Sequence, residues 1–97
     1  MSELSFEWDP EKAANNADKH GVTFEEAKSV FYDEDALVIP DPEHSMDEER
    51  FVIMGLSGNS RMLVVVHCFR KAGSSIRSIS ARRDGTKEQK PYLEKKR

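Results

Sequence analysis

The sequence predicts a single α+β domain over residues 1–97, with two N-terminal helices packed on a mainly antiparallel sheet and a short C-terminal helix. Two helix-start signals with periodic apolar residues lie in the first third of the chain. Three strand-like runs joined by short turns fill residues 50–83. With 97 residues and 37% hydrophobic content, the chain can bury one modest core.

The first helix has clear start and stop signals. A short strand at residues 5–8 precedes Asp9-Pro10, which has the form of a helix N-cap followed by proline at the first helical position. The helix should run to about Lys19 and end at His20-Gly21, because glycine suits the left-handed conformation just past a helix end.

A second helix should begin immediately afterwards. The segment Thr23-Phe24-Glu25-Glu26 has the spacing of a capping box, in which residues at the first and fourth positions satisfy free backbone donors. Phe24, Ala27, Val30 and Phe31 then share one helical face, which predicts that this face is buried.

The remaining elements follow from apolar runs separated by turn residues. A strand at 36–39 should stop at Pro40, and residues 41–49 form an acidic loop without the ligand spacing of a calcium site. The predicted sheet strands and their connections are 50–57, a Gly58-Asn59 turn, 61–70, a turn at 71–74, and 75–83. A last helix should begin at Thr86, with Gln89 completing a capping box and Pro91 shortening or kinking the helix.

The first hairpin sets the predicted faces of the sheet. A two-residue Gly58-Asn59 loop would pair Ser57 with Ser60 and place Arg50 opposite His67. The other face is more continuously apolar, so it should receive the helices. It carries Phe51, Ile53, Met62, Val64, Val66 and Cys68.

The second hairpin extends the polar face. Pairing Arg70 with Ser75 puts Ser78, Ser80 and Arg82 opposite His67, Val65 and Leu63, respectively. This gathers basic and hydroxyl side chains on the open face. A one-residue slip would exchange the roles of Arg82 and Arg83, so both are candidates for the cleft.

Charge is distributed unevenly along the chain. Residues 1–60 hold 4 basic and 15 acidic residues, whereas residues 61–97 hold 11 basic and 3 acidic residues. The cationic half is expected to meet a polyanion such as RNA. The candidate RNA-binding residues are Arg50, Arg77, Arg82, Arg83 and Lys87.

Several classes of protein are excluded by composition. The single cysteine, Cys68, lies in an apolar run and suits a small buried side chain, so no disulfide framework or thiolate metal site is predicted. The N-terminus has no basic leader and no apolar stretch approaches the length of a membrane span. A cytoplasmic protein that does not contact membranes is expected.

The polar face suggests a reaction that needs no cofactor. Arg, His and Ser without a metal-ligand set suit transfer of a ribose 2′-hydroxyl onto the adjacent phosphate. His67 is the candidate proton carrier, with Arg50, Arg82 and Arg83 as phosphate clamps. The competing interpretation is that an isolated histidine in a strand fills space and bonds a neighbour.

The chain also resembles a known family, the BrnT toxins, along nearly its whole length. The matching strings occur in the family's order. They are Phe6-Glu7-Trp8-Asp9-Pro10, Lys12, Asn16, Lys19-His20-Gly21-Val22, Phe24-Glu25-Glu26-Ala27, Ile39-Pro40-Asp41-Pro42, His44-Ser45, Glu49-Arg50-Phe51, Val64-Val65-Val66-His67 and Ile79-Ser80-Ala81-Arg82-Arg83. The chain departs from the family pattern at Cys68-Phe69 and at Asp84-Gly85.

The resemblance implies a ribonuclease toxin of a type II toxin-antitoxin system, with a compact fold similar to the RelE family. Such toxins cleave RNA without metal and arrest translation. A BrnA-type antitoxin silences the toxin and supplies the DNA-binding domain, so contact with DNA is indirect.

By the same resemblance, the candidate catalytic residues are Lys19, His20, Arg50, His67, Arg82 and Arg83. Lys19 and His20 equally suit a structural role, because cations favour the last turn of a helix. The alternative to an enzyme is a binding module that holds nucleic acid or a protein partner without cleaving RNA.

Overall fold

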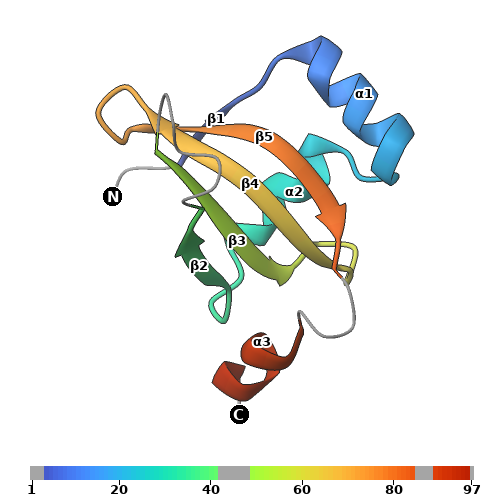
Figure 1. The fold of residues 1–97 in the computed structure, drawn as a ribbon, viewed down its shortest axis with the longest axis vertical. Helices are drawn as coiled ribbons and strands as arrows, with labels where there is room; N and C mark the ends of the chain where they lie inside the picture. The colour runs from blue at the N-terminus through green and yellow to red at the C-terminus, as the bar shows by residue number, and fades with distance from the viewer. Residues whose placement is uncertain (1–3, 42–48, 85–88, 97) are drawn as a thin grey trace.

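The structure is a computed structural model that describes residues 4–41, 49–84 and 89–96. Its elements follow the order β1 (Ser5–Glu7), α1 (Pro10–His20), α2 (Phe24–Val30), β2 (Leu37–Pro40), β3 (Arg50–Leu56), β4 (Met62–Arg70), β5 (Ser75–Arg83) and α3 (Gln89–Lys96). The strands form one five-stranded sheet in the order β1-β5-β4-β3-β2 (Figure 1). β1 runs parallel to β5, and the other neighbouring strands are antiparallel. The predicted α+β class is therefore confirmed.

Both N-terminal helices begin at the predicted caps. The side chain of Asp9 accepts a hydrogen bond of 2.8 Å from the Glu11 N–H, and Pro10 opens α1. Gly21 ends α1 with φ of 69°, and its N–H donates to the Ala17 carbonyl. At α2, the Thr23 hydroxyl accepts from the Glu26 N–H at 3.1 Å.

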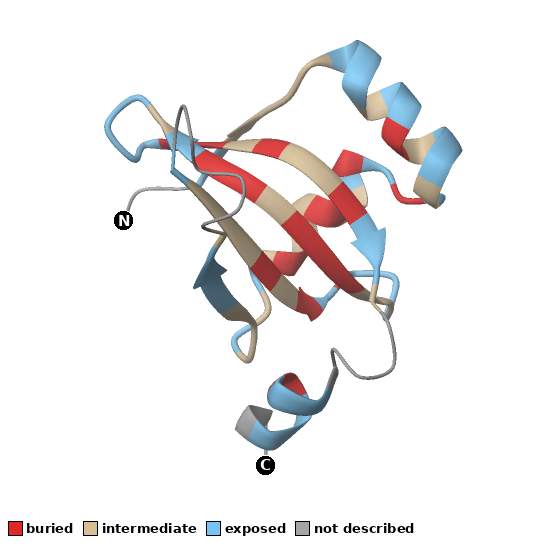
Figure 2. Cartoon of the chain, viewed as in Figure 1, coloured by how far each residue is buried: buried red, intermediate tan, exposed pale blue. Residues whose placement is uncertain are grey.

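One face of the sheet is covered by α2, which lies behind the strands in Figure 1. The apolar face of this helix packs on the central strands, so most buried residues lie along β4, β5 and α2 (Figure 2). The buried core consists of Val22, Phe24, Ala27, Val30, Ile53, Leu63, Val65 and Ala81. We refer to this side as the helix-covered face and to the opposite side as the open face.

The β3–β4 turn differs from the prediction. It has three residues rather than two, since the Ser57 N–H donates to the Arg61 carbonyl at 2.8 Å and Ser60 adopts a left-handed φ of 60°. Contacts with α2 hold this longer loop. The Ser57 hydroxyl donates to the Glu26 carboxylate at 2.7 Å, and the Gly58 N–H donates to the Ser29 hydroxyl at 2.7 Å.

An ion pair strengthens the same junction. The Arg61 guanidinium donates to both oxygens of the Glu26 carboxylate and to the Gly21 carbonyl. The hydrogen bonds from Arg61 to the carboxylate lower the pKa of Glu26, while burial opposes the shift. Glu26 thus links α2 to the turn.

The extra loop residue shifts the β3–β4 register by one. Phe51 lies opposite His67 and Arg50 lies opposite Cys68, so the predicted pairing of Arg50 with His67 is wrong. The predicted faces of β3 are correct, but those of β4 are wrong, because residues opposite each other in a ladder share a face. His67 lies on the helix-covered face with Ile53 and Val65, whereas Arg50 lies on the open face.

The β4–β5 hairpin follows the prediction only up to a bulge. Arg70 pairs with Ser75 and His67 with Ser78, as predicted. Ile79 is then an extra residue in β5, so Ser80 lies opposite Val66 rather than Val65. Beyond the bulge, Arg82 lies opposite Val64 on the open face, and Arg83 lies opposite Leu63 on the helix-covered face.

The C-terminal helix α3 is held to the segment between α2 and β2. The Tyr92 hydroxyl donates to the Asp33 carboxylate at 2.7 Å, and burial together with Asp33 raises the pKa of Tyr92 to about 12. Pro91 falls in the first turn of α3, where its missing N–H disrupts no helical hydrogen bond. The predicted cap at Thr86 and most of the acidic loop lie outside the described residues. No helix in the described part of the chain is long and apolar enough to cross a membrane.

Replacing Gly55 by alanine should destabilise the fold. A Cβ atom at this buried strand position would lie 3.0 Å from Ala36 Cβ, 3.0 Å from Val30 Cγ1 and 3.1 Å from Asp33 Oδ2. We expect Gly55→Ala to lower the free energy of unfolding by about 1–3 kcal/mol in chemical denaturation. Gly58→Ala is the control, because its Cβ would meet Ser29 only at 3.6 Å. Equal stability of the two variants would contradict the close packing at Gly55.

Candidate active site

A single side chain fixes α1 against the edge of β5. The buried Asn16 amide nitrogen donates to the Ala81 carbonyl at 2.8 Å and to the Val22 carbonyl at 3.0 Å. Its amide oxygen accepts from the Ala81 N–H at 3.0 Å. Because β1 pairs with β5 only at residues 75–77, Asn16 takes the place of a strand neighbour further along β5.

A shallow pocket lies where α1 passes the β5 bulge. It has a volume of about 220 Å³ and is lined by Lys12, Asn15, Asn16, Lys19, His20, Ile79 and Ser80. Two lysines and a histidine therefore share a small concave surface with amide and hydroxyl groups. These groups are suited to bind a phosphate. We refer to it as the α1–β5 pocket.

Helical spacing explains why these side chains meet. Lys12, Asn16 and Lys19 are separated by four and three residues, so they lie on one face of α1. Asn16 points inward to β5, and its neighbours border the pocket. Lys19 and His20 also lie in the last turn of α1, where cations interact favourably with the helix dipole.

The end of β5 adds two more cations. Arg82 and Arg83 follow the pocket residue Ser80 and are both exposed. The Arg82 guanidinium donates to the Arg83 carbonyl at 3.3 Å. Since the two side chains lie on opposite faces of the strand, they flank the sheet edge rather than one cleft.

The environment of His67 overturns its predicted place on the open face. Only 1% of His67 is exposed, and its ring packs edge-on against Phe31 with centroids 4.8 Å apart. Phe51 and Phe69 complete an aromatic cluster around it. Burial lowers the pKa of His67, opposed by a contact of 3.2 Å between Nδ1 and the Val65 carbonyl. A neutral imidazole shielded from solvent results.

The other predicted residues are spread over the molecule. Arg50 and Arg77 both lie opposite Cys68 on the open face, and Cys68 is buried as predicted. Lys87 lies outside the described residues. The structure thus brings Lys19 and His20 together with Ser80, but it separates Arg50 from His67.

Lys12 and Asn15 are pocket residues that the sequence did not single out as a site. The available signal was the helical spacing of polar residues on α1, but the position of the β5 bulge was needed to interpret it. Within residues 4–41, 49–84 and 89–96, no three His, Cys, Asp or Glu side chains gather as a metal-binding group.

Comparison with known proteins identifies the family. A family model described as the ribonuclease toxin BrnT of type II toxin-antitoxin systems matches residues 8–88. The chain belongs to the BrnT family. The predicted resemblance is therefore confirmed. Comparison with curated proteins gives no match.

A solved structure supports the same fold. The chain is similar to the crystal structure of the Brucella abortus ribonuclease toxin BrnT, with a TM-score of 0.67 and 21% sequence identity. The similarity covers 87% of this chain and 100% of the Brucella chain. The described architecture is thus that of a BrnT protein.

The buried histidine should make stability depend on pH. Because the pKa of His67 is lower in the folded state, the unfolded state binds the proton first as pH falls below the ordinary value of 6.5. The contribution of His67 to the free energy of unfolding is therefore largest above that pH, and it is lost as pH falls toward the pKa of His67 in the folded state. Between about pH 7 and 5, His67 should add a slope of up to about 1.4 kcal/mol per pH unit.

Denaturation curves of the wild type and His67→Leu over this range test that expectation. The variant should show a flatter dependence of unfolding free energy on pH. Glu26, whose pKa is also lowered, changes the stability only below its ordinary value of 4.5, which lies below this range. Identical slopes would show that His67 is not held neutral by burial.

Proposed function

We propose that the chain is a toxin that cleaves RNA without a metal ion, inhibits translation in the cytoplasm and is neutralised by a BrnA-type antitoxin. Its membership of the BrnT ribonuclease family supports the reaction class. The observation that carries the proposed location is the α1–β5 pocket, where Lys19 and His20 lie beside Ser80. RNA offers phosphates to these cations and a 2′-hydroxyl as the nucleophile.

In the proposed reaction, the His20 imidazole accepts the proton of the 2′-hydroxyl. The 2′-oxygen then forms a bond to the adjacent phosphorus, and the bond between phosphorus and the 5′-oxygen breaks. The Lys19 ammonium gives a proton to the leaving 5′-oxygen. The products are a 2′,3′-cyclic phosphate and a free 5′-hydroxyl, and no redox partner or cofactor takes part.

The remaining cations bind the RNA and stabilise developing charge. Lys12 borders the pocket and suits a flanking phosphate. Arg82 and Arg83 extend from the exposed end of β5, where a guanidinium favours bidentate contact with phosphate. His67 has a structural role in this proposal, since its ring is enclosed by aromatic side chains.

The second candidate is a binding module of the same fold that holds RNA without cleaving it. The burial of His67 favours it, because the histidine with the strongest sequence case for proton transfer is removed from solvent. Cations attract phosphates whether or not a reaction follows. Chemical analysis of the RNA product separates the two functions.

We expect purified, antitoxin-free protein to cleave RNA in excess EDTA and to leave 2′,3′-cyclic phosphate ends or their 3′-phosphate hydrolysis products. The pocket cations supply the positive charge that a metal would otherwise provide. Mass spectrometry of the RNA ends gives the result. An activity abolished by EDTA and restored by magnesium would contradict the proposed chemistry, whereas intact RNA bound at micromolar protein would favour the binding module.

Substitutions in the pocket should separate proton transfer from phosphate attraction. His20→Gln should lower the rate of cleavage by about 100-fold or more while changing RNA affinity little. Lys19→Gln should lower both the rate and the affinity, because it loses a charge next to the phosphate. Lys90→Gln, on the exposed side of α3, is a matched control for loss of one lysine.

His67→Leu provides the decisive contrast. At pH above 7, where the variant should fold, its cleavage rate should stay within a few-fold of the wild type. A 100-fold loss in a folded His67→Leu protein, with no loss in His20→Gln, would move the reaction to the aromatic cluster.

A further inference from the structure

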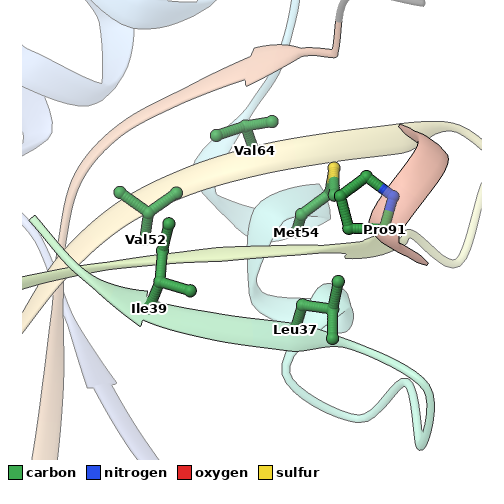
Figure 3. Close-up of a pocket in the computed structure, with 6 residues that line it drawn as sticks. All are labelled: Leu37, Ile39, Val52, Met54, Val64 and Pro91. Atoms are coloured by element: carbon green, nitrogen blue, oxygen red, sulfur yellow. The ribbon is translucent and has the colours of Figure 1, made fainter. Parts of the chain in front are cut away.

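An apolar groove lies on the open face of the sheet, away from the α1–β5 pocket. Figure 3 shows its lining side chains converging from three strands and α3. It has a volume of about 250 Å³, and its described lining residues are Leu37, Ile39, Val52, Met54, Val64 and Pro91.

The strand register explains why the groove is continuous. Leu37 lies opposite Met54, which lies opposite Val64, and Ile39 lies opposite Val52 in the next row. The anchored Tyr92 hydroxyl holds α3 so that the neighbouring Pro91 forms one end. Leucine, valine and isoleucine in this arrangement are the side chains of a hydrophobic interface.

The groove lies on the face opposite to α2. That helix packs on Ile53, Leu63 and Val65, which point the other way from the groove residues. Ile39 remains 60% exposed. Apolar side chains gathered in this way favour an apolar partner over water.

Two arginine side chains of β5 lie on the same face as the groove. Arg82 lies opposite the groove residue Val64, and Arg77 lies opposite Cys68, further along the sheet. They belong to the half of the chain with 11 basic and 3 acidic residues. A partner with an apolar ridge and flanking Asp or Glu would complement both features.

Two other occupants fit less well. RNA bases stack on aromatic rings, and the described lining residues include none. In a twofold dimer of this chain, the arginines of the two open faces would come together and repel each other. The chemistry favours a protein segment of opposite charge.

We propose that the antitoxin docks an amphipathic helix in this groove, with apolar side chains against Ile39, Val52 and Met54 and acidic side chains toward Arg77 and Arg82. This inference rests on the antitoxin partner of the proposed function but not on RNA cleavage. The antitoxin therefore binds the open face, whereas RNA cleavage takes place in the α1–β5 pocket.

Two exposed positions of β2 give a matched test. Ile39 points into the groove, and its neighbour Val38, 52% exposed, lies opposite Ile53 on the helix-covered face. Both are substituted with glutamate, and affinity for the purified antitoxin encoded with this toxin is measured by calorimetry. Ile39→Glu should weaken binding by roughly 100-fold and Val38→Glu by no more than about 3-fold. Both variants should cleave RNA like the wild type.

A truncation that adds no charge keeps the test independent of folding effects. The double variant Leu37→Ala with Ile39→Ala should weaken antitoxin binding by roughly 10-fold, with circular dichroism confirming the fold. Raising the salt concentration should slow association, because it screens the arginines from the acidic partner.

Three outcomes would overturn the proposal. Antitoxin binding by Ile39→Glu within 3-fold of the wild type would place the interface elsewhere. If Ile39→Glu lost affinity for RNA and kept normal antitoxin binding, the groove would be an RNA-binding surface. A wild-type toxin that sediments as a dimer, and becomes a monomer on Ile39→Glu substitution, would make it a self-association surface. Failure of RNA cleavage alone would affect the proposed function and leave the docking result intact.

Discussion

The paired hydrogen bonds between Asn16 and Ala81 are the constraint on which the placement of the α1–β5 pocket depends. One carboxamide satisfies both backbone groups of Ala81 and also the Val22 carbonyl. Leaving buried groups of this kind unpaired costs about 1–3 kcal/mol each. The same side chain that completes the edge of the sheet therefore holds the cations of α1 beside the β5 bulge.

This arrangement divides the molecule into three parts. The helix-covered face contains the core and the aromatic cluster around His67, which stabilise the fold. The edge beyond Asn16 presents cations and a hydroxyl group. The open face presents an apolar groove, and Arg82 lies opposite its residue Val64. Arg82 belongs to both proposed sites, but the groove and the α1–β5 pocket share no described lining residue. The proposed RNA cleavage and antitoxin binding can therefore be altered by different substitutions.

The helix boundaries could be predicted because their signals are local. Asp9, Gly21 and Thr23 act through groups only two to four residues away. The register of β3 could not be predicted in this way. The turn gains a third residue through contacts of Ser57 with Glu26, which is 31 residues distant in sequence. A one-residue shift then moves every side chain of the ladder relative to its partners.

The candidate site shows the same limit. Lys19 and His20 were identified by resemblance to the BrnT family, and Gly21 correctly predicted that they lie in the last turn of a helix. Their nearness to Ser80 depends on the bulge at Ile79, and no residue pattern in β5 predicts this bulge. His67 was assigned to the wrong surface because its predicted face came from the turn alone.

Amide chemical shifts of the ¹⁵N-labelled protein, recorded as an RNA oligonucleotide with 2′-O-methyl groups is added, test the central claim most directly. Such RNA binds but cannot be cleaved, since its 2′-hydroxyls are blocked. The largest shifts should fall on Lys19, His20 and Ser80, with little change at Ile39 and Val52 in the groove. Shifts centred on the groove, with Lys19 and His20 unchanged, would contradict an RNA site between α1 and β5.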